Sequence, residues 1–144
     1  MAHSCSESAV FSMPAEKCWQ MIRDFDFPAK YIGTVEKVDI LEKAGLTCVG
    51  AVRAVTWKTK EVEKHRLLAI DDLERKICWE LVEAEPPAEI TGRISTVKVD
   101  RITENNSCLV TWSCEFAADV KPDLLKFTQK SLKEDLVEMK GKMK

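Results

Sequence analysis

The sequence is poor in the residues from which several kinds of functional site are built. It has five glycines, which do not cluster, and only two histidines. A phosphate-cradling loop needs clustered glycines, and a zinc site needs closely spaced cysteine and histidine ligands such as a Cys-x-x-Cys pair. Neither pattern is present, so we expect neither a cofactor nor a metal ion.

An excess of charge of one sign and a long apolar run are also lacking. The chain has 22 basic and 24 acidic residues, for a net charge of −2. It therefore has no basic surplus to attract nucleic acid, and no apolar run approaches the roughly 20 residues of a membrane helix. The first ten residues, "MAHSCSESAV", lack the apolar core of a secretory signal. We expect a cytoplasmic protein that neither inserts into membranes nor binds nucleic acid; whether it has a protein partner stays open at this stage.

The six cysteines do not imply a disulfide framework in the absence of a secretory signal. Cys18, Cys48, Cys78 and Cys108 are thirty residues apart, but their flanking segments share no hydrophobic period, so we interpret the spacing as coincidence. Buried free cysteine behaves as a small hydrophobic residue, and free thiols are expected throughout.

The length of 144 residues suits a single domain over 1–144, and hydrophobic periodicity divides it into three parts. Residues 6–13 alternate as a strand does, and two short helices follow over 14–25 and 26–33. Residues 35–117 show only strand signals, in six runs with short links, which favours an antiparallel meander.

The chain ends in a predicted helix of roughly 20 residues that Pro122 opens. One apolar stripe runs along it at spacings of three and four: Leu125, Thr128, Leu132, Leu136, Met139 and Met143. Only this helix is long enough to cover the apolar face of the sheet. We therefore predict an α+β fold in which a curved antiparallel seven-stranded sheet wraps around the C-terminal helix and leaves an internal cavity.

Four segments, in order, resemble motifs of one known superfamily. They are "PAEKCWQMIRDFDFPAKYIG", "VGAVRAV", "HRLLAIDD" and "LVTWSCEF". Together they make the chain similar to the START-like helix-grip superfamily, and within it to the polyketide cyclase/dehydrase group. The resemblance covers about residues 6–140 and implies a pocket for a small, mostly apolar molecule with one polar or acidic end. A fold of this kind hosts many activities, so the resemblance does not specify one.

The chain departs from its better-known relatives, lachrymatory factor synthase and the abscisic acid receptors. His65 stands where the family often has an inward Glu, and Arg93 where several relatives have a Tyr. Tyr31 is followed by Ile32, where the receptors have a ligand-anchoring Lys. Neither specific activity can therefore be transferred.

The period of two sorts the strand residues into faces, and the resemblance places Arg53 inward. On the strand that begins "EVEKHRLLAID", His65 shares a face with Leu67 and Ala69. The predicted lining of the cavity is Arg53, Val55, Trp57, His65, Leu67, Trp79, Leu81, Arg93, Ser95 and Trp112. Two loops, "WKTKE" and "EAEPPAE", are expected to frame its entrance, unless they are ordinary connections.

Arg53, His65 and Arg93 thus place three polar groups on inward faces. Unpaired cations are costly to bury, so these groups need partners, and an acidic ligand would supply one. The alternative is purely structural: His65 bonds a neighbour, Arg53 pairs with Glu63, Glu80 or Glu83, and Arg93 extends to the surface.

Three functions remain open at this stage. The first is a carrier or sensor of a small amphipathic, acidic or phenolic metabolite. The second is a cofactor-independent cyclase, dehydratase or isomerase in which His65 moves a proton and Arg53 and Arg93 stabilise an oxyanion. The third is a protein-interaction module that uses the long helix or the sheet edges.

Overall fold

The computed structural model describes residues 3–144, and its order of elements confirms the prediction. The chain forms a strand, two short helices, six strands and a long helix. The strands are β1 (His3–Phe11), β2 (Val35–Ile40), β3 (Val52–Trp57), β4 (Val62–Asp71), β5 (Lys76–Glu85), β6 (Arg93–Ile102) and β7 (Ser107–Phe116). The helices are α1 (Ala15–Ile22), α2 (Phe27–Tyr31) and α3 (Pro122–Lys142), with one 3-10 turn, η1 (Leu41–Lys43).

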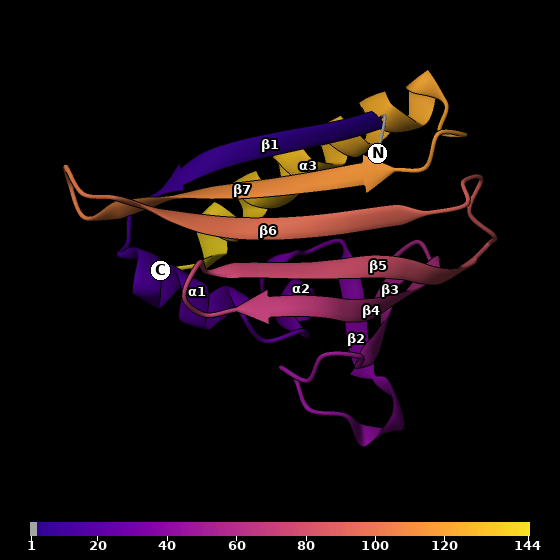
Figure 1. Cartoon of the computed structure of the whole chain (residues 1–144), viewed down its shortest axis with the longest axis horizontal. Helices are drawn as coiled ribbons and strands as arrows, with labels where there is room; N and C mark the ends of the chain where they lie inside the picture. Colours follow the sequence, from indigo (N-terminus) through magenta and orange to yellow (C-terminus); the bar gives the residue numbers. More distant parts are fainter. Residues whose placement is uncertain (1–2) are drawn as a thin grey trace.

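The strands form one antiparallel sheet in the order β1-β7-β6-β5-β4-β3-β2. Consecutive strands from β2 to β7 are neighbours, and β1 closes the far edge by pairing with β7 along its whole length. Figure 1 shows the sheet curving, with α3 running behind β1 and β7, α2 behind β5 and β4, and α1 at the left-hand end of the sheet, where it contacts β6 and β7. The predicted α+β class is correct, as is the seven-stranded sheet over a C-terminal helix.

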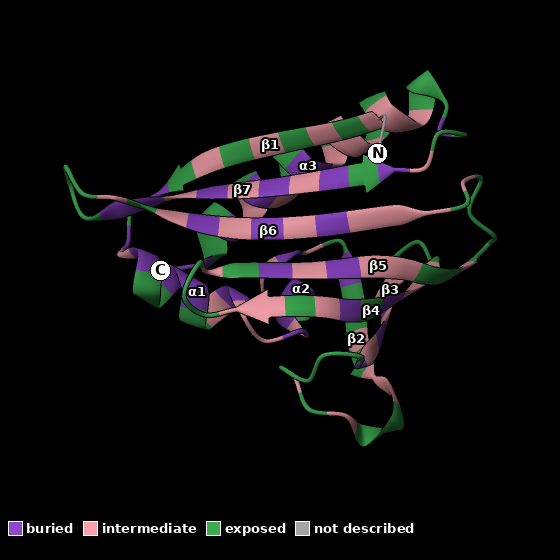
Figure 2. Ribbon diagram, in the orientation of Figure 1, coloured by how far each residue is buried: buried purple, intermediate pink, exposed green. Residues whose placement is uncertain are grey.

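The core lies between the concave face of the sheet and the helices. Buried and half-buried positions alternate along most of β6 and β7, as the purple and pink bands in Figure 2 show. The buried residues of β7 include Val110, Trp112, Cys114 and Phe116, the face that the period of two predicts. All six cysteines are free, and three of them are buried in this core.

The apolar stripe of α3 faces the core over its C-terminal half. Leu132, Leu136, Met139 and Met143 are buried, whereas Leu125 and Thr128 near the start of the helix are only half-buried. The stripe is therefore fully covered only toward the C-terminal end of the helix, and a cavity lies against residues 127–135. No helix among residues 3–144 has both the length and the apolar character needed to cross a membrane.

Two strand predictions need correction. The expected strand over 48–58 begins only at Val52, because Gly50 adopts φ +92°, a left-handed conformation that glycine reaches without steric cost. On β4, His65 and Leu67 are buried but Ala69 is exposed. A register shift between Leu67 and Ala69 explains this difference, because a bulge moves later residues to the opposite face.

Side-chain clamps hold the helices in place. Asp72, in the β4–β5 turn, accepts hydrogen bonds from Trp19 Nε1 at 2.7 Å and from Arg23 Nε at 3.0 Å, which ties α1 to the sheet. Glu138 on α3 accepts a hydrogen bond from the backbone N–H of Gly33. A Cβ at Gly33 would lie 2.8 Å from Glu138 Oε1, so the absence of a side chain permits this close approach.

Candidate functional site

A cavity of about 350 Å³ lies between the concave face of the sheet and the middle of α3, residues 127–135. Residues from β3, β4, β5, β6 and β7 form one wall, α3 forms the opposite wall, and α2 with the segment before β2 closes one side. Its volume equals that of roughly 12 liquid-water molecules and lies near the lower end of the range for small-molecule sites. A compact organic molecule would fill it.

Eight of the ten predicted residues line this cavity. They are Arg53, Val55, Trp57, His65, Trp79, Arg93, Ser95 and Trp112. The other two, Leu67 and Leu81, are not among the lining residues in the part of the chain that the structure describes.

Leu67 and Leu81 share the inward face but lie at the wrong positions along their strands. Leu67 is fully buried opposite Trp79, within the packed core. Leu81 follows the last residue at which β5 pairs with β6, the Glu80–Ile94 pair, and is half-exposed there. Periodicity assigns a side chain to a face, but distance along the strand decides whether it reaches the cavity.

One of the two expected entrance loops lines the cavity. Thr59 and Glu61 of the β3–β4 hairpin are lining residues. None of the lining residues belongs to "EAEPPAE", residues 83–89, which extends past the part of β5 that pairs with β6. Phe127, two-thirds exposed, lines the cavity from α3 instead.

His65 is the centre of a buried hydrogen-bond chain. It lies opposite Arg53 in the β3–β4 pairing, and Arg53 Nε donates to His65 Nδ1 at 3.1 Å. Since Nδ1 accepts, the proton of the neutral ring is on Nε2, which donates to Glu63 Oε1 at 2.8 Å. Both ring nitrogens are therefore engaged, and the imidazole is oriented by one residue on each side.

Glu63 joins this chain to Arg93. Arg93 Nη2 donates to Glu63 Oε1 at 2.6 Å and Nη1 to Glu63 Oε2 at 3.3 Å, a two-pronged ion pair. Arg93 is the first residue of β6, where β5 and β6 are no longer paired, so its long side chain can reach β4. The sequence offered Glu63 only as a structural partner for Arg53; the structure pairs it with Arg93 and His65.

Arg53 is 1% exposed and has no carboxylate within ion-pair distance among residues 3–144. Its Nη1 donates to the backbone oxygen of Phe25 at 2.8 Å, and its guanidinium carbon lies 4.3 Å from the ring centre of Phe25 and 4.5 Å from that of Trp79. Aromatic faces and a carbonyl thus partly compensate for the charge, and the carboxylates of Glu63 and Asp26 act on it only from beyond ion-pair distance.

The surroundings determine the charge of each group. Burial lowers the pKa of His65 to about 4, assisted by the charges of Arg53 and Arg93, so His65 is neutral near pH 7. Burial, followed by the charge of Arg93, lowers the pKa of Arg53 to about 9, which leaves it protonated. Although burial raises the pKa of Glu63, its bonds to His65 and Arg93 lower it to about 2. Two guanidinium groups and one carboxylate therefore give this cluster a net charge of +1.

Aromatic side chains form the apolar part of the wall. The rings of Trp79 and Trp112 meet edge to face at 5.9 Å, and Phe27 lies 6.0 Å from each of them. Trp112 Nε1 is buried and has no hydrogen-bond acceptor in the described part of the chain. An orphaned donor of this kind is uncommon in a folded protein, and here it belongs to a residue that lines the cavity.

The polar lining that α3 contributes did not emerge from the sequence. Thr128, Ser131 and Asp135 all line the cavity. Thr128 was assigned to the apolar stripe, and the other two were not singled out. Their spacing of three and four, beside the stripe of leucines, is the signal that could have identified them.

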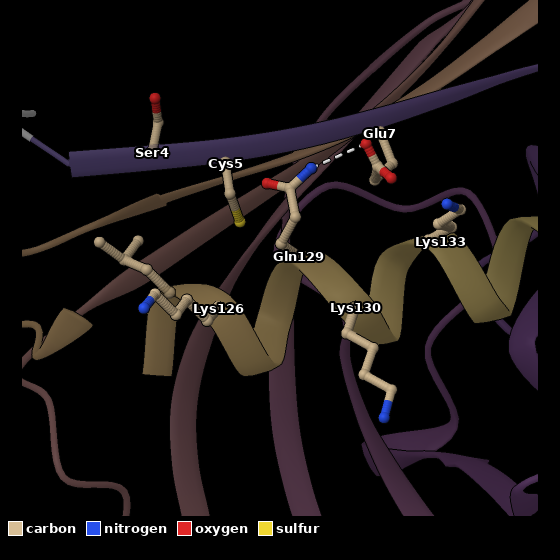
Figure 3. Close-up of a pocket in the computed structure, with 8 residues that line it drawn as sticks. Ser4, Cys5, Glu7, Lys126, Gln129, Lys130 and Lys133 are labelled. Carbon is tan, nitrogen blue, oxygen red and sulfur yellow. Dashed lines mark hydrogen bonds between the residues drawn. The ribbon is translucent and has the colours of Figure 1, made fainter. Parts of the chain in front are cut away.

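A second hollow, of about 500 Å³, lies on the surface between β1 and α3. Figure 3 shows Gln129 bridging this groove to Glu7, with Lys126, Lys130 and Lys133 along the same helix. Gln129 Nε2 donates to Glu7 Oε2 at 2.7 Å and to the backbone oxygen of Ser6 at 2.6 Å, so this contact fixes α3 to the edge strand. Within residues 3–144, no cluster of three His, Cys, Asp or Glu side chains is arranged to hold a metal ion.

Comparisons with known proteins agree with this architecture. A protein from Nitrosospira multiformis is 19% identical and superposes with a TM-score of 0.86, over 99% of this chain and 97% of that chain. An uncharacterised protein from Bacillus thuringiensis is 23% identical, with a TM-score of 0.82 over 96% and 97% of the two chains. Ara h 8.0201 is 19% identical, with a TM-score of 0.76 over 96% and 95%. At these identities the likeness establishes the fold alone, which is the helix-grip fold.

A search of curated proteins finds no match. The family is established by a model described as polyketide cyclase / dehydrase and lipid transport, which matches residues 2–144. Family and fold together fit a protein with a hydrophobic cavity that binds a small ligand. The chain belongs to the polyketide cyclase / dehydrase and lipid transport family.

Proposed function

We propose that this protein is a carrier or sensor that binds a small amphipathic organic acid or phenol in the cavity. Arg53 carries this proposal, because its buried guanidinium lines the cavity without a carboxylate partner. An anionic ligand group would supply the missing counterion, and guanidinium groups match carboxylates and phenolates well. The tryptophans of the wall would pack against the apolar body of the ligand.

The volume of the cavity narrows the class of ligand. Space for roughly 12 waters corresponds to a molecule of about the same number of non-hydrogen atoms, smaller than a long-chain lipid. Flat aromatic rings suit a wall in which Trp79 and Trp112 meet edge to face. A two-ring aromatic acid is therefore a suitable probe.

Binding ranks ahead of catalysis because of how His65 is held. A general base needs a free lone pair that faces the substrate, but His65 Nδ1 already accepts from Arg53 and its Nε2–H donates to Glu63. Its lowered pKa also makes it a weak base near pH 7. These contacts support a role in orienting Arg53 and Glu63 rather than in transferring protons.

Binding also ranks ahead of a protein-interaction role. The large exposed hydrophobic residues are spread over several elements: Val10 on β1, Val49 before β3, Leu73 in the β4–β5 turn, Val82 on β5, and Phe127 and Val137 on α3. A protein-docking surface would gather such residues into one patch.

The test is calorimetric titration with naphthalene-2-carboxylate and its neutral amide. The wild-type protein should bind the carboxylate at least about tenfold more tightly than the amide, since an ionic hydrogen bond in a buried site contributes roughly 1.5–3 kcal/mol. Arg53→Met and Arg93→Met should each reduce this preference. Arg66→Met is the matched control, because Arg66 lies on the exposed face of β4.

Circular dichroism and urea unfolding would identify variants that fail to fold, and Arg53→Lys provides a variant that keeps the charge. Equal affinity for the carboxylate and the amide, or no binding of either, would overturn the proposal. If the carboxylate is preferred, native mass spectrometry of gently purified protein, with organic extraction of bound material, would identify the natural ligand class.

A further inference from the structure

We propose that Asp135 is a specificity-determining residue of the cavity. It accepts a hydrogen bond from a hydroxyl group at the end of the ligand remote from Arg53 and Arg93, so that hydroxylated acids bind better than their unsubstituted parents. This inference rests on the proposed function, because it concerns the opposite wall of the same site.

The position of Asp135 follows from the helical repeat. Thr128, Ser131 and Asp135 follow one another at spacings of three and four, so they lie along one face of α3, and all three line the cavity. The guanidinium groups of Arg53 and Arg93 line it from β3 and β6. A ligand held by its acidic group at the sheet therefore extends its other end toward a polar strip on the helix.

Asp135 differs from its acidic neighbours on α3 in having no partner. Glu138 accepts the backbone N–H of Gly33, and Glu134 is 3.9 Å from Lys130 Nζ in an ion pair. For Asp135, the described part of the chain supplies neither a hydrogen bond nor an ion pair, although this side chain is half-buried. A carboxyl group that is half-buried in a cavity wall without a donor can accept one from a ligand.

The pKa of Asp135 agrees with a carboxyl group that has no hydrogen-bond donor. Burial, then the charges of Glu138 and Glu134, raise the pKa of Asp135 to about 7. A donor on the ligand would stabilise the ionised form. The other charged side chains that line the cavity are Arg53, Glu61, Glu63 and Arg93 on the sheet side and Glu134 on α3.

Trp112 provides an independent observation. It is 7% exposed, it lines the same cavity, and its indole N–H has no acceptor within residues 3–144. The residues that line the cavity therefore include an unsatisfied donor, which is covered in this structure, as well as an unsatisfied acceptor. A hydroxyl group both donates and accepts, whereas a carboxylate only accepts and an alkyl or aryl group does neither.

The experiment compares naphthalene-2-carboxylate with its hydroxylated isomers, in which the hydroxyl occupies each position of the distant ring in turn. Calorimetric titrations near pH 8 keep Asp135 ionised. We expect at least one isomer to bind the wild-type protein about tenfold more tightly than the parent. The gain should disappear in Asp135→Ala and persist in Asp123→Ala, which changes an exposed acid of the same helix that does not line the cavity.

The charge of Asp135 should have a second effect on binding, which a purely structural role would not produce. Removing its negative charge should strengthen binding of the unsubstituted parent acid near pH 8, in Asp135→Asn as well as in Asp135→Ala. The inference is overturned if no isomer gains over the parent in wild type, or if the gain survives in Asp135→Ala. If the parent still binds and still depends on Arg53, only this inference fails; if neither parent nor isomers bind, the proposed function fails with it.

Discussion

The buried, neutral state of His65 makes the stability of this protein depend on pH in a calculable way. The side chain is 4% exposed, and its pKa is lowered from 6.5 to about 4. Between these two values the unfolded chain binds a proton on His65 that the folded protein does not, so stability falls as the pH falls. At about 1.4 kcal/mol per pKa unit, the loss is about 3 kcal/mol by pH 4.

His65→Gln is the informative perturbation. The glutamine oxygen can accept from Arg53 Nε and its amide N–H can donate to Glu63, so both contacts of His65 are retained without a titrating ring. We expect the free energy of unfolding of the variant to fall by about 3 kcal/mol less than that of the wild type between pH 7 and about pH 4.

Urea unfolding followed by tryptophan fluorescence measures this difference directly, because acid effects shared by both proteins cancel. His3→Gln is the matched control, since it removes the other histidine, which lies half-buried on edge strand β1. His3→Gln should follow the wild-type profile. The reasoning is refuted if His65→Gln and wild type lose the same stability across this window, or if the His65 ring titrates by NMR near its ordinary pKa.

Three further predictions concern the same site and its surroundings. Glu63→Gln leaves Arg93 without its counterion in a largely buried position and should cost about 2–4 kcal/mol in urea unfolding, whereas Glu80→Gln, whose pair with Arg66 is exposed, should cost at most about 1 kcal/mol. Leu67→Ala should lower the free energy of unfolding by about 2–5 kcal/mol yet leave the affinity for naphthalene-2-carboxylate within about twofold, because Leu67 lies in the core beside the cavity. The control Leu73→Ala, at an 84% exposed position, should change stability by less than about 0.5 kcal/mol. Asp135→Asn should stabilise the protein by about 1–3 kcal/mol near pH 8 and not at all below about pH 4. The reason is that the raised pKa of Asp135 makes its ionisation unfavourable for the folded state. The same stability near pH 8 in variant and wild type would contradict this assignment.

The sequence alone predicted the order of elements, the antiparallel sheet and the face on which most of the lining residues lie. These features depend on local periodicity, which is written directly in residues such as Val110, Trp112 and Cys114. The period of two also placed His65 and Arg93 on faces with apolar neighbours, and the family resemblance placed Arg53 inward; all three line the cavity. The prediction that Ala69 faces inward was wrong, because a bulge in β4 before Ala69 interrupts the period of two. The residues before the bulge alternate regularly, so they do not indicate it.

The tertiary structure decided which inward groups meet and which side chains complete the cavity. Glu63 pairs with Arg93 because β5 and β6 separate at their ends and allow an arginine from β6 to reach β4, a consequence of strand register and not of composition. Asp135 lines the cavity because residues 127–135 of α3 lie across this space from the concave face of the sheet. The net positive charge of the buried cluster depends on the burial of His65, which holds that ring neutral. Periodicity determines the face that a residue occupies, whereas contacts between elements distant in sequence determine its partners and its charge.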